Sequence, residues 1–187
     1  MTAMPPVSPW SPLPLPRLAP DVSGWRAELQ MQLARRGDAS RLVATRHVGP
    51  LRLQRPFYPE GERHPHVYLL HPPGGMVPGD SLDIDIAVGE QASGLVTTPA
   101  SGKVYDVGER ALPQRQRVTI EVADGGVVEW LPQDTLFFNG ARYVGETTVN
   151  LRGSAQAIFW DIATLGRRAG GFPFEAGAVS QKLSIYR

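Results

Sequence analysis

Apolar and polar residues alternate with a period of two along much of this chain. The clearest run spans residues 82–88, where leucine, isoleucine and valine alternate with aspartate and alanine. Residues 27–34 and 118–122 alternate in the same way. Alternation over four to eight residues is typical of a strand with one buried face. These three segments are therefore predicted to be strands.

Shorter strand-like segments make up most of the remaining chain. They lie at residues 41–46, 66–70, 94–98, 127–131, 135–138, 143–151, 156–162 and 183–186. Turn-forming residues separate them at Gly89-Glu90, Asp124-Gly125-Gly126, Asn139-Gly140 and Arg152-Gly153. The spacing of an amphipathic helix is absent, so at most a turn or two of helix is expected, near residues 163–168. Many short strands at close spacing predict an all-β sandwich, barrel or β-helix-like stack.

The two ends of the chain differ from its middle. Residues 1–24 contain a proline every few positions, which predicts a disordered or polyproline-like leader. The folded domain is expected to span residues 25–187. Its last predicted strand reaches the end of the chain, where it would be an exposed edge. A domain shortened at its C-terminus is one interpretation of this arrangement.

Composition narrows the classes of function. The 187 residues include 19 basic and 18 acidic ones, and the basic residues form no stripe, which argues against nucleic acid or an anionic membrane as partner. No apolar stretch is long enough to span a bilayer, and the N-terminus does not resemble a secretory signal. The absence of cysteine removes disulfides and thiol catalysis. We therefore predict a cytoplasmic protein.

The residues from His71 to Asp80 form an unusual connection between two predicted strands. They include three prolines and three glycines, which fix one backbone path rather than a loose linker. A rigid connection that carries an imidazole and a carboxylate is a favourable place for function. The structural members of this predicted turn are Pro72, Pro73, Gly74, Gly75 and Gly79.

Catalytic motifs are weak in this sequence. Gly79-Asp80-Ser81-Leu82 matches the nucleophile motif of an esterase family, but no Asp-x-x-His follows to supply the base. The residues His64, His66 and His71 offer metal ligands of the kind used by cupin enzymes, yet no later histidine completes that set. We favour surface or turn histidines, with weak ligation of a divalent ion left open. A metal-dependent β-fold enzyme remains the alternative, and a truncated binding module is a third hypothesis.

A series of segments, taken in order, resembles the urease accessory protein D family (UreD or UreH). The segments are Trp25-Arg26-Ala27-Glu28-Leu29, Gly49-Pro50-Leu51-Arg52, Gln54-Arg55-Pro56-Phe57-Tyr58-Pro59-Glu60, residues 66–75, Gly79-Asp80, Thr97-Thr98-Pro99, Lys103 with Tyr105, Glu129-Trp130-Leu131-Pro132-Gln133, Trp160-Asp161-Ile162 and Gly166-Arg167. His-Pro-Pro-Gly-Gly and Glu-Trp-Leu-Pro-Gln are the most specific of them. Pro65 departs from the family, whose members frequently have cysteine at this position.

The resemblance implies a flattened, β-helix-like fold and a role without catalysis. Members act as scaffolds in the nickel-dependent maturation of urease, together with accessory protein F, the GTPase accessory protein G and the urease apoprotein. By this resemblance Asp80, Glu129 and Asp134 would be acids along a polar nickel route, and Lys103 would orient an acid or contact a partner. His71 would be a weak metal ligand. No tightly bound cofactor is expected, only nickel in transit.

Overall fold

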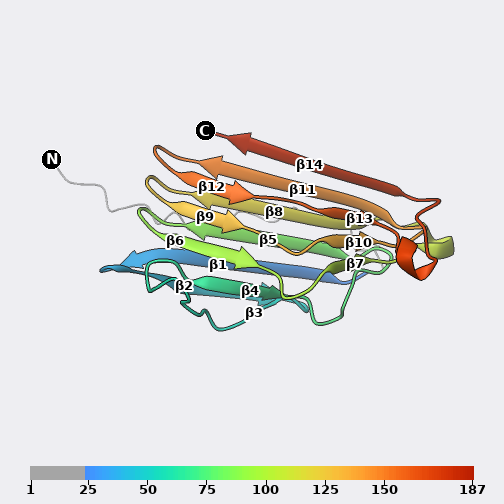
Figure 1. The fold of residues 1–187 in the computed structure, drawn as a ribbon, viewed down its shortest axis with the longest axis horizontal. Coiled ribbons are helices and arrows are strands. Elements are labelled where there is room, and N and C mark those ends of the chain that lie inside the picture. The colour runs from blue at the N-terminus through green and yellow to red at the C-terminus, as the bar shows by residue number, and fades with distance from the viewer. Residues whose placement is uncertain (1–23) are drawn as a thin grey trace.

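The computed structural model describes residues 24–187, in which almost all regular structure is β-strand (Figure 1). Six strands form the largest sheet, in the spatial order β14 (Ala178–Tyr186), β11 (Arg142–Leu151), β8 (Gln114–Val122), β5 (Ser81–Val88), β1 (Arg26–Arg36) and β2 (Ala39–Val48). Five strands form the second, in the order β12 (Gln156–Phe159), β9 (Val127–Trp130), β6 (Ser93–Thr97), β4 (His66–Leu70) and β3 (Arg52–Leu53). The third contains β13 (Ala163–Leu165), β10 (Thr135–Phe137) and β7 (Gly102–Val104). The all-β prediction is confirmed.

The chain winds through the three sheets as a flattened β-helix. After β5 it runs through β6, β7 and β8, then through β9, β10 and β11, and then through β12, β13 and β14. Equivalent strands of successive turns pair in parallel in every sheet. Figure 1 shows the two smaller sheets lying side by side over the six-stranded sheet. Parallel strands usually need a crossover helix, but here the other two sheets supply the connection.

Ladders of aliphatic side chains between the layers form the core. The predicted strand at residues 82–88 is β5, and its alternate residues are buried. Ile84 pairs with Leu29 of β1 and with Val118 of β8, so equivalent apolar residues stack across the sheet. Each such side chain stabilises the fold by roughly 1.5–3 kcal/mol. Between layers, the rings of Phe137 and Tyr143 pack with centroids 5.0 Å apart.

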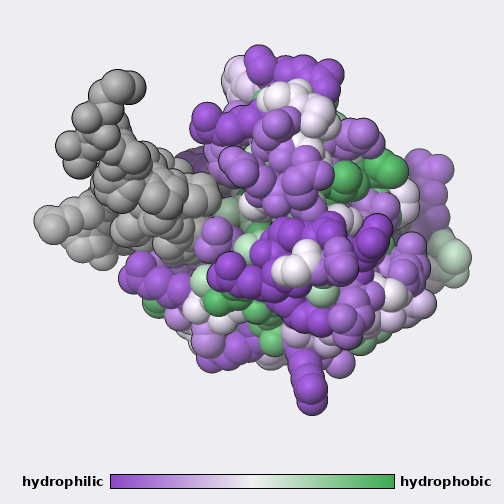
Figure 2. Space-filling model, turned by 90° about the vertical axis from the view of Figure 1, so that its left-hand side faces the viewer, coloured by the Kyte–Doolittle hydropathy of each residue, from purple (hydrophilic) through white to green (hydrophobic). Residues whose placement is uncertain are grey.

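The turns predicted at the glycine-containing segments are present, and turns of successive coils stack at one end of the β-helix. In the turn between β8 and β9, Gly125 has φ +65°, a conformation that favours glycine. The Asp124 carboxylate in this turn accepts the Ser154 backbone N–H at 2.7 Å, which ties it to the turn of the next coil. This end of the molecule is mainly hydrophilic, with small separate hydrophobic areas (Figure 2).

The chain after residue 155 differs from the prediction in two ways. The strand predicted at 156–162 forms but ends at Phe159, and near residues 163–168, where at most a turn or two of helix was expected, the chain forms β13 followed by the single-turn 3-10 helix η2 (Arg168–Gly170). Residues 163–165 pair in parallel with residues 135–137 of β10. A strand of three residues is too short to show a period, so the tertiary pairing decides its conformation.

A second 3-10 helix, η1 (Gly108–Arg110), precedes β8. In residues 24–187 no helix is both long and apolar enough to cross a membrane. Apart from Gly24, the predicted leader at residues 1–24 lies outside the described residues.

Candidate functional site

A cavity of about 200 Å³ lies between the sheets, and all three sheets contribute to its lining. Apolar residues, including Leu69, Ile84 and Trp130, form much of its wall. A smaller number of polar side chains also line it: His71, Lys103, Gln116, Gln133 and Asp161. A mostly apolar cavity with a few polar groups is the usual form of a ligand site.

The turn after His71 forms one wall of this cavity. Gly74 has φ +79°, and its N–H donates to the His71 carbonyl at 3.0 Å, which closes the turn. Gly75 passes so close to β7 that a Cβ at this position would lie 2.4 Å from Tyr105 Cε2. The Met76 N–H then donates to the Lys103 carbonyl at 2.8 Å. The turn thus brings His71 and Lys103 to the same cavity.

His71 offers a nitrogen ligand there. Burial lowers the pKa of His71, and the nearby Asp80 carboxylate opposes that shift. A lowered pKa favours the neutral imidazole, which is the form that ligates a metal ion.

Asp161 is the acid of the cavity. Burial raises the pKa of Asp161, while hydrogen bonding from Thr147 and Trp130 opposes that shift. The Thr147 hydroxyl donates to Asp161 Oδ2 at 3.0 Å. The buried Trp130 N–H makes no hydrogen bond of normal geometry within residues 24–187, yet it lies near enough to favour the ionised carboxylate. Asp161 as a residue is exposed, so solvent screens these interactions. It can present carboxylate oxygens to a cation in the cavity.

Asp80 is buried, with 4% of its surface exposed, but it is not among the residues that line the cavity. Its two carboxylate oxygens accept the backbone N–H groups of Trp25, at 2.8 Å, and Val77, at 2.9 Å. Both oxygens therefore already hold the backbone in place. A role for Asp80 on a nickel route stays a prediction.

The two remaining predicted acids also lie beside the cavity rather than on its wall. Asp134 precedes β10 and accepts hydrogen bonds from the Ser101 hydroxyl and, at 2.6 Å, from the Thr164 hydroxyl. These bonds lower the pKa of Asp134. Glu129 projects from β9, and its Oε1 lies 3.8 Å from Nε2 of His64. Of the residues predicted along the nickel route, only Lys103 and His71 therefore line the cavity.

A second group of potential ligands includes two of the predicted histidines. Side-chain donor atoms of Glu60, His64 and His66 lie within 4.8 Å of one another. Glu60 Oε1 and His66 Nε2 are 2.7 Å apart. In the described part of the chain His71 does not belong to this group. The three-histidine site of the enzyme alternative is therefore not formed.

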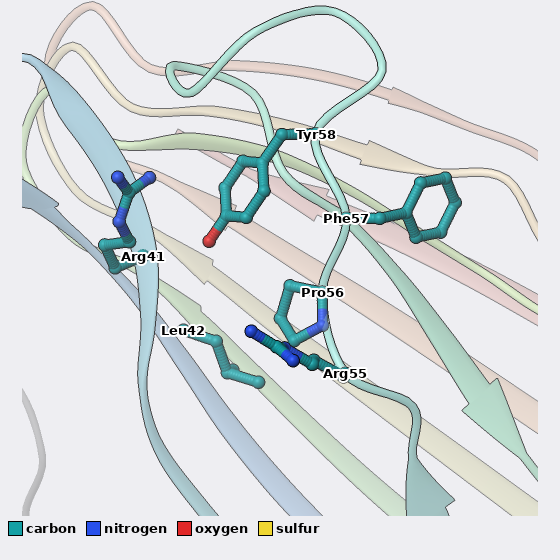
Figure 3. Close-up of a pocket in the computed structure, with 6 residues that line it drawn as sticks. All are labelled: Arg41, Leu42, Arg55, Pro56, Phe57 and Tyr58. Carbon is teal, nitrogen blue, oxygen red and sulfur yellow. The ribbon is translucent and has the colours of Figure 1, made fainter.

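A pocket at the surface has a different character. It measures about 730 Å³ and is lined by Arg41, Leu42, Arg55, Pro56, Phe57 and Tyr58. Figure 3 shows Tyr58 turned toward Arg41, whose guanidinium lies 4.9 Å from the ring centroid, and Phe57 turned away. Arg41 also pairs with Glu62 at 2.7 Å. A hollow lined by cationic and apolar side chains does not suit a metal cation.

Comparison with known proteins identifies the family. The family model described as UreD urease accessory protein matches residues 26–187. The chain belongs to this family. It is 45% identical over 163 residues to the urease accessory protein UreD of Saccharophagus degradans, covering 87% of this chain and 55% of that protein. It is 44% identical over 165 residues to that of Hahella chejuensis, covering 87% of this chain and 52% of that protein.

The chain spans about half the length of these UreD relatives. The urease accessory protein UreD 2 of Brucella anthropi is similar in this respect: the match is 44% identical over 165 residues and covers 88% of this chain and 60% of that protein. The resemblance inferred from the sequence segments is thus confirmed for nearly all of the described residues.

Two site residues escaped prediction from sequence. Asp161 lies in the Trp160-Asp161-Ile162 segment and Glu60 in the Tyr58-Pro59-Glu60 segment, both of which carry the UreD resemblance. Their presence in family segments was a usable signal. Their neighbours in space, however, come from distant parts of the chain, and a single sequence does not show those contacts.

Proposed function

We propose that this chain takes part in urease maturation as a scaffold that passes nickel toward the urease apoprotein and catalyses no reaction itself. Membership of the UreD family supports the coarser role. The passage of nickel is supported by one observation, which is the cavity between the sheets that His71, Lys103 and Asp161 all line. Nitrogen and oxygen donors in a mostly apolar passage suit a borderline cation such as Ni²⁺.

The donors of the cavity suit transit better than storage. Tight nickel sites gather several ligands around one ion. Here His71 is the single imidazole of the cavity lining and Asp161 the single carboxylate, and Lys103 adds a positive charge that disfavours a resident cation. Such a passage would hold nickel weakly and release it. Asp80, Glu129 and Asp134 would contribute to the negative potential around the route.

The proposal includes the partners that the resemblance implies. Accessory protein F and the GTPase accessory protein G would form the complex with this chain on the urease apoprotein, and GTP hydrolysis would belong to accessory protein G. The chain carries no Gly-x-x-x-x-Gly-Lys-Ser/Thr phosphate loop, which is consistent with that division of work. A cytoplasmic location is part of the proposal and is consistent with a chain without cysteine.

Co-expression tests this function directly. Urease and its other accessory proteins are produced with the native chain, with His71→Ala plus Asp161→Asn, or without the chain, and urease-bound nickel is measured in each case. We expect nickel loading with the native chain, a large loss with the double variant and none without it. His47→Ala, an exposed change on β2, is the matched control. Full loading without the chain would end the proposal.

A second candidate function rests on one observation. Two histidines and one carboxylate, as found at Glu60, His64 and His66, are also the ligand set of many metal-dependent oxygenases. That function requires substrate turnover by the isolated, metal-loaded chain. The scaffold function requires none, so activity assays on the purified chain separate the two.

A further inference from the structure

We propose that Glu60, His64 and His66 form a binding site for one divalent transition-metal ion, with Glu129 as a flanking acid. The site lies apart from the cavity, because none of these four residues belongs to the cavity lining. The proposal is independent of the proposed function. It concerns metal binding by the isolated chain, whether or not the chain acts in urease maturation.

The three donors are close enough to share one ion. Their ligand atoms all lie within 4.8 Å of one another. Donors bound to an ion at about 2.1 Å lie roughly 3–3.5 Å apart in tetrahedral or octahedral geometry. Glu60 has 63% of its side chain exposed, so it can rotate to close this difference. The histidines, whose side chains are 15% and 17% exposed, would move little.

The ring of His64 is arranged as that of a metal ligand. Its Nδ1 contacts the Ser93 hydroxyl, while its Nε2 is buried and makes no hydrogen bond within the described residues. If Nδ1–H donates to Ser93, Nε2 presents an unpaired lone pair 3.8 Å from the Glu129 carboxylate. A buried lone pair that faces a carboxylate at this distance is unfavourable without a cation between them. Hydrogen bonding of the second ring nitrogen is also how ligating histidines are usually oriented.

Backbone contacts hold the group in place before any ion binds. Phe57 and His66 exchange two backbone hydrogen bonds, at 3.1 and 2.9 Å. The Gly61 N–H donates to the Tyr58 carbonyl at 3.2 Å, which closes the turn that carries Glu60, and the His64 N–H donates to the Gly61 carbonyl at 3.2 Å, which closes the next turn. The Phe57 ring lies edge-on to His66, with centroids 5.4 Å apart, and forms an apolar wall. The fold therefore already positions these residues, so little further conformational entropy is lost when an ion binds.

The donors select the class of ion. Imidazole nitrogens combined with carboxylate oxygens favour Ni²⁺, Zn²⁺ or Co²⁺ over Mg²⁺ and Ca²⁺, which prefer oxygen ligands alone. The Glu60 and Glu129 carboxylates supply two negative charges, and they lie 2.7 Å from His66 Nε2 and 3.8 Å from His64 Nε2, respectively. A divalent ion would balance these charges. It would also replace the direct contact between Glu60 Oε1 and His66 Nε2.

Metal titration of the purified chain tests this site. Ni²⁺ and Zn²⁺ are titrated separately by calorimetry, and bound metal is counted after equilibrium dialysis. We expect one ion per native chain. His66→Gln and Glu60→Gln should each weaken binding at least about tenfold. Mg²⁺ should not compete.

Matched variants distinguish this site from other histidines. His47→Gln, on the exposed part of β2, should leave the measured affinity unchanged. Glu60→Gln changes an exposed side chain, so it reports on binding even if a histidine variant folds poorly. Absence of stoichiometric binding by the native chain would overturn the proposal, as would native affinity in both Glu60→Gln and His66→Gln.

Discussion

Trp25 and Asp80 are joined across 55 residues of sequence by a hydrogen bond from the Trp25 backbone N–H to Asp80 Oδ1, at 2.8 Å. The other carboxylate oxygen accepts the Val77 N–H at 2.9 Å. One buried side chain therefore fixes the start of β1 against the loop before β5. The parallel pairing of the two strands begins immediately afterwards, at Arg26 and Ser81.

The first prediction concerns this junction. Asp80→Ala leaves two backbone N–H groups without their acceptors, so we expect the free energy of unfolding to fall by about 1–3 kcal/mol. Asp80→Asn keeps one acceptor oxygen and should cost less. Urea denaturation of the two variants and the native chain provides the measurement. Equal stability of Asp80→Ala and the native chain would contradict the structural role.

A functional test of Asp80 must separate loss of a metal ligand from loss of stability. Loss of urease activation in Asp80→Ala alone would not distinguish a nickel ligand from a fold-stabilising carboxylate. Activation lost in Asp80→Asn at native stability would point to the ligand role.

The second prediction compares two neighbouring glycines of the cavity wall. At Gly74 a Cβ would meet nothing within 4 Å, so Gly74→Ala carries only the strain of φ +79°, roughly 1–2 kcal/mol. At Gly75 a Cβ would lie 2.4 Å from Tyr105 Cε2 and 3.1 Å from the Lys103 carbonyl oxygen. Gly75→Ala must therefore displace Tyr105 or β7, and overpacking of this kind costs about 1–3 kcal/mol.

Near-ultraviolet circular dichroism separates these two effects. Tyr105 stacks on Phe138 with ring centroids 5.0 Å apart, and this arrangement should change in Gly75→Ala but not in Gly74→Ala. Identical spectra for the two variants would mean that the close approach at Gly75 is unimportant.

The strands were predictable because their signal is local. In β5 the side-chain alternation is visible within the segment itself, and the same is true of β1 and β8. The first five residues of β14, Ala178 to Lys182, were missed, because on this edge strand most of them are exposed and apolar residues do not alternate among them. β7 and β13, of three residues each, exist only because they pair with β10.

The candidate site was less predictable, for a related reason. His71 and Lys103 were found because they flank a turn of unusual composition. Asp161 lies at the cavity only because the chain winds as a β-helix. Glu60 lies beside His66 because of a turn that has no recognisable sequence motif. Glu129 was predicted as an acid of the nickel route, and in the structure its Oε1 lies 3.8 Å from His64 Nε2. Contacts that depend on how distant coils of the β-helix align cannot be predicted from a single sequence, so they become visible only in the structure.

The third prediction is a pH dependence at Asp161. Its pKa is raised by burial, so the folded state favours the protonated form. The cost is absent below the ordinary pKa of aspartate and grows as pH rises through the raised folded value. Asp161→Asn mimics the protonated form and should gain stability relative to the native chain over that range. We expect a gain below about 1 kcal/mol, because solvent reaches this residue.

Urea denaturation of both proteins at pH 4 and pH 8 measures this difference. The Thr147 hydroxyl can still donate to the amide oxygen of asparagine, which makes the substitution conservative. A native chain that gains stability over Asp161→Asn as pH rises would show that hydrogen bonding outweighs burial at this carboxylate.

The fourth prediction has the opposite sign. Hydrogen bonds from Ser101 and Thr164 lower the pKa of Asp134, so the ionised form is favoured in the folded state. This stabilisation is present above the ordinary pKa of aspartate and is lost as pH falls through the lowered folded value. Asp134 also lies between β7 and β13, since Ser101 precedes one strand and Thr164 belongs to the other. Asp134→Asn should therefore lower the free energy of unfolding at pH 7 by about 0.5–1.5 kcal/mol.

The differences in the free energy of unfolding between each variant and the native chain should both shrink as pH falls. They have opposite signs, because Asp134→Asn is less stable than the native chain and Asp161→Asn is more stable. Measuring both variants in the same buffers controls for every other titrating group of the chain. Thr164→Val removes one of the two hydrogen bonds and should reproduce part of the Asp134→Asn effect. If Asp134→Asn were as stable as the native chain at pH 7, the carboxylate would not be holding the three-stranded sheet together, and a role on the metal route would become the better explanation of its position.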